Sequence, residues 1–418
     1  MSQLEVQTDT RPRIGLVLPG GGARGAYQVG VLKAVAKIYT GQRTPFPIKS
    51  GVSVGAINAA SLASRADRFH TGVERLEHLW ANLEPSSVYR TDMRCVARNG
   101  LQWLLSLTLG GLGPANPKAL LDTAPLTRLL RQQLQLERIP ETIASGALEA
   151  VAVTASSYAT NRAVTFFQGH DRHREWIRTR RDGLRATLTP DHLLASTSLP
   201  LLFPAHSIGN EYYGDGSLRL TAPLSPAIRL GADKLLIIGV RDGAMDAPPP
   251  RGEMPDYPSL GALAGYLMDV IFSDNLDADI ERLRRINSTL ALLSAEDRNA
   301  TPLRSVEPLV IRPSQDLREI AARHAHRMPH PIRMLMRGVG AWGPDGRLAS
   351  FLLFQRHYTQ ELIALGYQDG MAHEATLRRF LQFKDAESAA APEDTPDRDA
   401  PGPQDVKAPS DSTEDAPR

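Results

Sequence analysis

The feature that most constrains this chain is the pentapeptide at residues 51–55, Gly-Val-Ser-Val-Gly. It follows a short apolar stretch and precedes residues 56–63, whose small side chains are typical of a tightly packed helix. A serine between two glycines at a strand-to-helix junction is typical of a nucleophile elbow, because the sharp turn exposes the hydroxyl and leaves no room for larger neighbours. We therefore take Ser53 as a candidate nucleophile, with Gly51 and Gly55 shaping the elbow. Alone, the motif fits an ordinary glycine-rich turn equally well.

A second glycine cluster lies upstream of the elbow. The apolar run 13–18 shows little alternation, which is what a parallel strand covered on both faces requires. The next 14 or so residues, 26–39, carry apolar side chains at helical spacing. Strand, glycine loop, helix, strand and elbow together predict a βαβ unit. The loop between the first strand and the helix consists of Pro19, Gly20, Gly21, Gly22, Ala23, Arg24 and Gly25.

This loop also satisfies the G-x-G-x-x-G pattern of dinucleotide-binding proteins. That interpretation requires an acidic residue at the end of the second strand, and none occurs between Tyr39 and Ser53. The alternative is an oxyanion hole built from the backbone N–H groups of Gly20, Gly21 and Gly22, which no side chain would block. Removing one such donor typically costs about 100- to 1,000-fold in rate.

The third motif is Asp215-Gly216-Ser217, at the expected end of a strand. A serine hydroxyl needs a base to remove its proton during attack, and Asp215 is a candidate for that role. An isolated Asp-Gly pair usually marks only a turn. A Ser-Asp-His triad, for example with His324, stays open from spacing alone, although none of the eleven histidines stands in an equally specific context.

Residues 101–113 are unusually apolar and end in glycines. One interpretation is a buried helix with a glycine stop, and the other is a lid or interfacial segment beside an acyl-chain pocket. Elsewhere we expect helices at 69–83, 125–136 and 259–292, strands at 147–156, 162–168, 234–240 and 306–312, and several helices within 316–383.

Composition and charge limit the cellular setting. The single Cys95 excludes an intrachain disulfide and fits a reducing compartment. The first 13 residues lack the apolar region of a signal peptide, and no apolar run approaches the roughly 20 residues of a spanning helix. Residues 385–418 carry ten acids and three bases, so a net charge of +9 remains on 1–384. We expect a cytoplasmic protein that associates peripherally with the inner membrane surface, without a nucleic-acid partner.

Changes in composition predict the domain organisation. The tail has almost no large apolar residue and cannot bury enough surface to order itself. The sequence does not indicate an oligomeric state. The predicted parts are a flexible N-terminus at 1–12, a catalytic domain at 13–240, a proline-rich loop at 241–258, a mainly helical region at 259–384 and a disordered acidic tail at 385–418.

Taken together, the motifs resemble those of the patatin-like phospholipase family. The family pairs a glycine-rich loop, a G-x-S-x-G elbow and a D-G-G/A turn, found here at 20–25, 51–55 and 215–217. A fourth family-like segment, A-S-x-x-x-P, matches Ala195 to Pro200. The order and spacing of four motifs are far more specific than any one of them. The resemblance covers 13–240, with weaker likeness over 259–383.

The resemblance implies a three-layer α/β fold with a mostly parallel central sheet and helices on both faces. It also implies a Ser-Asp dyad without histidine, in which Ser53 attacks the ester of a phospholipid or another lipid and Asp215 accepts the proton. The amides of Gly20 to Gly22 would hold the oxyanion. Arg24 and Gly25 would steady the loop or contact lipid phosphate. Neither a metal nor a cofactor is implied.

One position departs from the family pattern, because Ser217 replaces glycine or alanine in the third motif. Its hydroxyl is small, and we expect it to be tolerated. The same dyad would also serve an acyltransferase or a thioesterase. A different class of function is a lipid-binding regulatory protein with weak hydrolase activity, and a third is a dinucleotide oxidoreductase.

Overall fold

The computed structural model describes residues 12–108, 119–243, 257, 259–338, 340, 342 and 346–381. All of them belong to one compact unit that ends at Leu381. The predicted N-terminal segment, most of the loop 241–258, the tail 385–418 and the end of the apolar segment 101–113 lie outside the described residues. The boundary between a catalytic and a helical domain therefore stays a prediction.

In the described residues a single sheet carries the fold. Its centre consists of five parallel strands in the order β10-β9-β1-β2-β3, and β4 and β8 both pair with β3 in antiparallel orientation. The strands are β1 (Ile14–Leu18), β2 (Ile48–Val52), β3 (Ala150–Ser157), β4 (Ala163–Gly169), β5 (Trp176–Arg178), β6 (Arg181–Arg185), β7 (His206–Ile208), β8 (Glu211–Asp215), β9 (Lys234–Ile238) and β10 (Glu307–Ile311).

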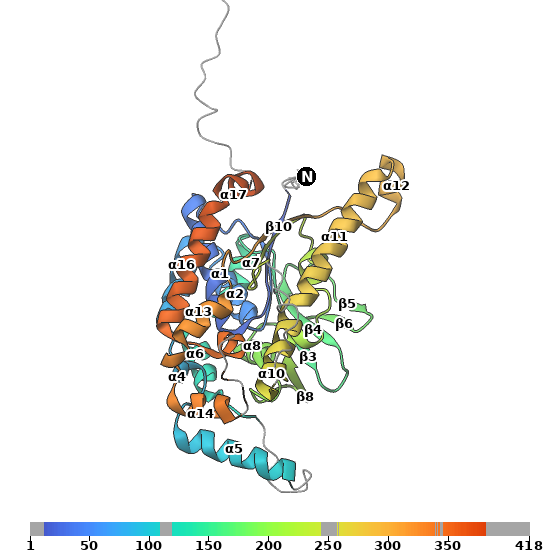
Figure 1. Ribbon diagram of the computed structural model, residues 1–418. Helices are drawn as coiled ribbons and strands as arrows, with labels where there is room; N and C mark the ends of the chain where they lie inside the picture. The colour runs from blue at the N-terminus through green and yellow to red at the C-terminus, as the bar shows by residue number, and fades with distance from the viewer. Residues whose placement is uncertain are drawn as a thin grey trace, which may run out of the picture. The chain divides into compact units, whose positions relative to one another are not determined.

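Helices cover both faces of this sheet, as the sequence predicts. Figure 1 shows α1 and α16 on one side of the strands and α11 on the other. Along β3, Val151 and Val153 pack with the helices of one face, whereas Ala150 and Ala152 pack with those of the other. This alternation follows from the two-residue period of a strand, and the apolar residues on both sides explain why the strand is buried throughout.

Nine helices of the described residues precede β9 in the chain. The predicted helix 69–83 is present as α3, and the predicted helix 125–136 as α6. These helices are α1 (Gly25–Ile38), α2 (Val54–Ala63), α3 (Phe69–Ala81), α4 (Pro85–Val88), α5 (Met93–Thr108), α6 (Ala124–Gln133), α7 (Ile139–Ala144), α8 (Pro190–Thr197) and α9 (Ser225–Arg229).

The predicted helical stretch 259–292 is interrupted by a π-helical turn, η4 (Val270–Asp274). It separates α10 (Leu260–Asp269) from α11 (Asn275–Leu292). The remaining helices are α12 (Ala295–Ala300), α13 (Leu317–His324), α14 (His330–Gly338), α15 (Arg347–Leu352), α16 (Arg356–Ala372) and α17 (Glu374–Leu381).

The C-terminal helices pack directly on the first helix. A Cβ atom on Gly30 of α1 would overlap the carbonyl oxygen of Ile363 in α16, so glycine permits this close crossing. The Tyr27 hydroxyl donates a hydrogen bond to Asp369 Oδ2 over 2.9 Å, and both residues are buried. Residues beyond 340 therefore help to fix the helix that follows the glycine loop.

Candidate active site

Ser53 occupies the turn between β2 and α2. Its φ is 53° and its ψ is −129°, a conformation that residues with a side chain rarely adopt. Such strain persists only where the surroundings hold it, and it is concentrated at functional sites. The geometry is that of the predicted elbow.

Both glycines of the elbow are required by close backbone contacts. A Cβ atom on Gly55 would overlap the carbonyl oxygen of Leu18 at the end of β1. A Cβ atom on Gly51 would overlap the carbonyl group of Gly55. The elbow can therefore approach the glycine loop only because both positions lack a side chain.

A serine on α8 supports the elbow through hydrogen bonds. The backbone N–H of Ser53 donates to Ser196 Oγ over 2.9 Å, and Ser196 Oγ donates to the carbonyl oxygen of Thr154 over 2.6 Å. Ser196 is completely buried. The motif at 195–200 indicated this segment in the sequence, but nothing there identified Ser196 as the residue that links the elbow to β3.

Asp215 ends β8 and is buried, with 1% of its surface exposed. The backbone N–H of Asp215 donates to the Ser198 carbonyl oxygen over 2.8 Å, and its own carbonyl oxygen accepts from Ser156 Oγ over 2.8 Å. The backbone N–H of Ser217 donates to Asp215 Oδ1 over 2.9 Å. Two of these bonds fix the backbone of Asp215, and the third holds one oxygen of its carboxylate.

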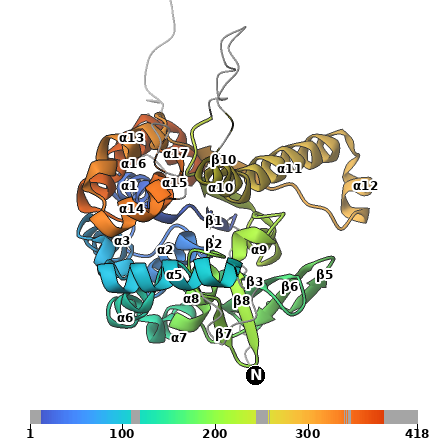
Figure 2. The same cartoon turned by 60° about the horizontal axis from the view of Figure 1, so that its bottom comes forward.

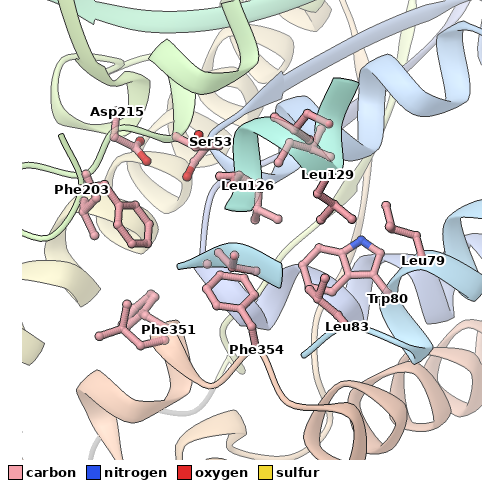
Figure 3. A pocket seen from close by; sticks show the side chains of 18 of the residues that line it. Ser53, Leu79, Trp80, Leu83, Leu126, Leu129, Phe203, Asp215, Phe351 and Phe354 are labelled. Atoms are coloured by element: carbon pink, nitrogen blue, oxygen red, sulfur yellow. The ribbon is translucent and has the colours of Figure 1, made fainter. Parts of the chain in front are cut away.

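The structure brings Ser53 and Asp215 together. Figure 3 shows the two side chains pointing toward one another at one end of a pocket. Burial raises the pKa of Asp215 to about 6, and hydrogen bonds from Ser53 and Ser217 oppose that rise. A carboxylate with this pKa is mostly ionised at neutral pH and still basic enough to accept a proton.

Ser217 fills the position where the sequence departs from the family pattern. Its bond to Asp215 comes from the backbone N–H, so replacement of glycine or alanine by serine leaves this donor in place. Within the described part of the chain its buried hydroxyl has no hydrogen-bond partner. A Cβ atom on Gly20 would lie 2.8 Å from that hydroxyl, which places the Gly216-Ser217 turn against the glycine loop.

The glycine loop leads from β1 into a short 3-10 helix, η1 (Gly22–Arg24), and then into α1. Gly22 has a φ of +55° and lines the same pocket as Ser53. A Cβ atom on Gly21 would lie 2.7 Å from a methyl group of Val240. The loop therefore lies between β9, the Asp215 turn and the pocket.

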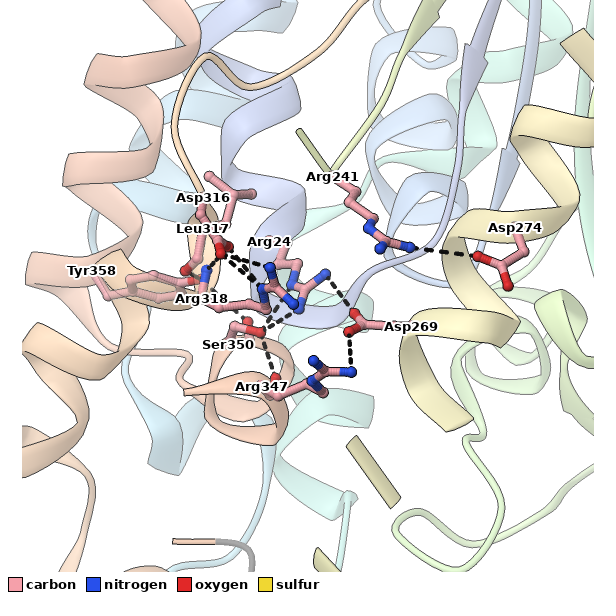
Figure 4. A network of polar contacts seen from close by, with 10 residues as sticks. All are labelled: Arg24, Arg241, Asp269, Asp274, Asp316, Leu317, Arg318, Arg347, Ser350 and Tyr358. Atoms are coloured by element: carbon pink, nitrogen blue, oxygen red, sulfur yellow. Dashed lines mark hydrogen bonds and ion pairs between the residues drawn. The ribbon is translucent and has the colours of Figure 1, made fainter. Parts of the chain in front are cut away.

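The side chain of Arg24 is buried and is not among the residues that line the pocket. Its Nη1 donates to Asp269 Oδ1 over 3.1 Å, and its Nε donates to Ser350 Oγ over 2.9 Å (Figure 4). The guanidinium carbon also lies 3.8 Å from the centroid of the Phe351 ring. These contacts fit a role in steadying the glycine loop. Gly25 begins α1 with its Cα against Val54 of the elbow helix.

A chain of buried amides joins the glycine loop to the pocket wall. Gln28 Nε2 donates to the carbonyl oxygen of Pro19 over 2.8 Å. Asn58 Nδ2 donates to Gln28 Oε1 over 2.9 Å, and Trp80 Nε1 donates to Asn58 Oδ1 over 2.9 Å. These residues could not be predicted from the sequence, because polar side chains scattered over three helices carry no recognisable spacing.

The pocket itself is apolar apart from its catalytic end. It encloses about 730 Å³, including its open mouth, and extends from Ser53 toward Leu79, Trp80 and Leu83 (Figure 3). The other lining residues are Gly22, Val54, Ile57, Val88, Leu126, Leu129, Leu130, Thr197, Leu199, Phe203, Asp215, Phe272, Phe351, Leu352 and Phe354.

Among the described residues that line the pocket there is no histidine. His324, the residue considered for a triad, lies on α13, where its Nε2 is 2.6 Å from Glu361 Oε2. The described ranges also contain no group of three or more His, Cys, Asp or Glu side chains placed to hold a metal ion. Ser53 therefore has an aspartate, and no imidazole, beside it in the pocket.

In the part of the chain that the structure describes, no helix is both long and apolar enough to cross a membrane.

Comparison with known proteins identifies the family. VipD from Legionella pneumophila is 14% identical with a TM-score of 0.31, and 84% of this chain aligns with 67% of it. Human GIVD cytosolic phospholipase A2, solved with methyl gamma-linolenyl fluorophosphonate, is 12% identical with a TM-score of 0.39, and 89% of this chain aligns with 59% of it. No curated protein matches. The family model described as patatin-like phospholipase matches residues 16–228, about half of the sequence, and the chain therefore belongs to the patatin-like phospholipase family.

Proposed function

We propose that the protein is a lipid acyl hydrolase of the phospholipase A or lysophospholipase type, with a Ser53–Asp215 dyad and a role in lipid metabolism. One observation carries the proposal: a strained, buried serine faces a buried aspartate at the polar end of an apolar pocket (Figure 3). Membership of a family described as phospholipases supports the same class of substrate.

In the first half-reaction, Ser53 Oγ attacks the carbonyl carbon of the ester while its proton passes to Asp215. The electron pair of the carbonyl bond moves to the oxygen, and the amides of Gly20, Gly21 and Gly22 donate hydrogen bonds to this oxyanion. When the tetrahedral intermediate collapses, the bond to the leaving alcohol breaks and that oxygen takes the proton from Asp215. Ser53 is left as an acyl ester.

In the second half-reaction, water attacks the acyl ester and gives its proton to Asp215. Collapse of the second tetrahedral intermediate releases the fatty acid and returns the proton to Ser53. Because burial raises the pKa of Asp215 to about 6, this carboxylate is a stronger base than an exposed one and yet remains ionised at pH 7. The same group can therefore serve both half-reactions.

The pocket supports a substrate with a long apolar chain. Its walls offer leucine and aromatic side chains from α3, α6 and the segment 351–354, and its polar groups are gathered at the Ser53 end. A phospholipid, a lysophospholipid or another lipid ester fits this arrangement.

The test is hydrolysis of a short-chain chromogenic ester and of phospholipid vesicles, in the presence of a chelator, by the wild type, Ser53→Ala, Asp215→Asn and a panel of single His→Ala variants. We expect turnover by the wild type, loss in the Ser53 and Asp215 variants, and little change in the histidine variants. Loss in one folded histidine variant would contradict the dyad.

The same assay separates the alternatives. Release of the alcohol with transfer of the acyl group to an added acceptor, rather than to water, would indicate an acyltransferase. Cleavage restricted to thioesters would indicate a thioesterase. Strong vesicle binding without turnover of any ester would indicate a lipid-binding regulatory protein.

A further inference from the structure

Helix α10 turns an apolar stripe toward solvent. Leu263, Tyr266 and Leu267 follow the i, i+3, i+4 spacing of one helix face, and all three are exposed, Leu267 by 55%. The opposite face is buried and carries Gly261, Gly265 and Asp269 at four-residue spacing. A surface helix normally has the reverse arrangement.

Two further helices lie at the same end of the molecule. Figures 1 and 2 place α5 and α14 at the end where α10 lies, and α5 packs on α14. Val96 and Ile332 are buried, whereas Leu101 of α5 and Met334 of α14 are exposed by 56% and 51%. Both helices therefore add outward-facing apolar side chains to those of α10.

The segment 199–203 connects the wall of the pocket to these exposed side chains. Leu199 and Phe203 line the pocket, and Leu201 between them is 63% exposed with a φ of 68°. The carbonyl oxygen of Leu201 accepts a hydrogen bond from the N–H of Leu120. The carbonyl oxygen of Leu120 in turn accepts one from Asn99 of α5 over 3.2 Å. A strained backbone thus holds an apolar side chain outward beside both the pocket and α5.

The exposed charges on these three helices are positive. Their only acidic residue is Asp269, which is buried and bound to Arg24. Against this stand four arginines, Arg94 and Arg98 on α5 and Arg333 and Arg337 on α14, for which the described ranges contain no acidic partner. Asp92, just before α5, pairs with Arg90.

We infer that the surface formed by α5, α10, α14 and the loop 199–203, which we call the docking face, binds the surface of an anionic lipid bilayer. This inference rests on the proposed function, since it places the pocket mouth against the substrate. Exposed leucine and tyrosine side chains enter the boundary between headgroups and acyl chains, while the arginines contact anionic headgroups. Phe272, three residues after α10, and Val88, five before α5, line the pocket, so lipid leaving the bilayer enters between these helices.

A bilayer fits this face better than a protein partner does. Soluble monomers seldom expose large contiguous apolar patches, and here the apolar side chains lie on separate helices with arginines among them, the arrangement of interfacial helices. The pocket, whose lining includes Leu199 and Phe203 of this face, is itself apolar and suits a lipid chain.

The test is sedimentation of the full-length Ser53→Ala protein with vesicles of phosphatidylcholine alone or mixed with phosphatidylglycerol. The test variants are Arg94→Glu/Arg98→Glu and Leu263→Ser/Leu267→Ser. The matched controls, Arg284→Glu/Arg298→Glu and Leu292→Ser/Leu303→Ser, change exposed residues on or near α11 and α12, which lie away from α5 in both views.

We expect binding to the anionic vesicles that weakens with added salt. Each test variant should bind at least about tenfold more weakly, because one reverses two bases that attract the anionic surface and the other withdraws two leucine side chains from the bilayer boundary. The controls should bind like their parent. Equal binding by test and control variants, or no binding by the parent protein, would overturn the docking face.

A separate readout distinguishes this outcome from failure of the proposed function. In proteins that retain Ser53, Arg94→Glu/Arg98→Glu should hydrolyse a soluble short-chain ester like the wild type and lose activity only on anionic vesicles. If the soluble ester is cleaved and vesicle binding is unaffected, the docking face is wrong and the hydrolase stands. If no ester is cleaved but binding depends on these arginines, the docking face stands and the hydrolase fails.

Discussion

Arg24 Nη1 lies 3.1 Å from Asp269 Oδ1, although 245 residues separate the two along the chain. Arg24 ends the short 3-10 helix of the glycine loop, and Asp269 ends α10. Arg347 also lies 3.5 Å from the other Asp269 oxygen (Figure 4). The glycine loop is therefore supported by residues outside the range 16–228 that the family model matches.

We predict that Asp269→Asn lowers the free energy of unfolding by about 3–5 kcal/mol, because breaking a buried ion pair leaves the other charge uncompensated. Arg24 is completely buried, and burial already lowers its pKa. Denaturant unfolding measures this loss. Glu281→Gln is the control: it removes an exposed partner of Arg285, and we expect a change within about 0.5 kcal/mol. A loss of that small size for Asp269→Asn would mean that the buried pair does not support the loop.

The pH dependence of hydrolysis should report Asp215. The base must be ionised, so kcat/KM should rise with pH, with a midpoint near the pKa of about 6, and level off above about 7. A soluble ester keeps the measurement free of membrane effects. Activity that stays constant down to pH 4 would contradict the role of a buried aspartate.

The same ionisation should lower the free energy of unfolding as the pH rises, whereas it raises the activity. The pKa of Asp215 in the folded protein lies above its ordinary value of 3.8, so the folded state binds this proton more tightly. The stabilising contribution is complete below about pH 4 and is lost as the pH rises through about 6. In Asp215→Asn, unfolding at several pH values should lack this component.

Replacement of an elbow glycine should prevent correct folding of the site. A Cβ atom on Gly55 would overlap the carbonyl oxygen of Leu18, and we expect Gly55→Ala to cost about 3 kcal/mol or more. Gly100 in α5 has no heavy atom within 4 Å of its would-be Cβ, so Gly100→Ala should stabilise the protein by about 0.5–1 kcal/mol. Thermal unfolding of the two variants checks the contrast, and similar shifts would contradict the backbone geometry.

The far end of the pocket should set the preferred acyl length. Figure 3 shows Leu79 at the end opposite Ser53, and Leu79→Trp would fill that end. We expect kcat/KM for a long-chain ester to fall at least about tenfold relative to a short-chain ester. His78→Trp adds the same bulk to an exposed neighbour on α3 and should leave the ratio unchanged. An unchanged ratio for Leu79→Trp would mean that the acyl chain lies elsewhere.

The sequence predicts the parts of the site that depend on local backbone geometry. The elbow around Ser53 and the glycine loop are visible because close approach and unusual φ values restrict those positions to glycine. The buried strands are visible because a sheet covered on both faces needs apolar runs. These features account for the confirmed fold class.

Other parts depend on long-range contacts that no local pattern encodes. Ser196 supports the elbow across 143 residues, and Asp269 reaches Arg24 across 245. The short strands β5 (Trp176–Arg178) and β6 (Arg181–Arg185) were not predicted, because their mixed charged and apolar residues lack the alternation of a half-buried strand. The π-helical turn that carries Phe272 into the pocket also lies inside an otherwise regular helical pattern.

Covalent labelling of Ser53 by an alkyl fluorophosphonate, followed by intact-mass measurement and peptide mapping, tests the Ser53–Asp215 dyad most directly. We predict one adduct per chain, located on Ser53, absent in Ser53→Ala and formed much more slowly in Asp215→Asn, because Asp215 accepts the proton during attack. An adduct on another residue, or equal labelling rates in Asp215→Asn and the wild type, would contradict the Ser53–Asp215 dyad.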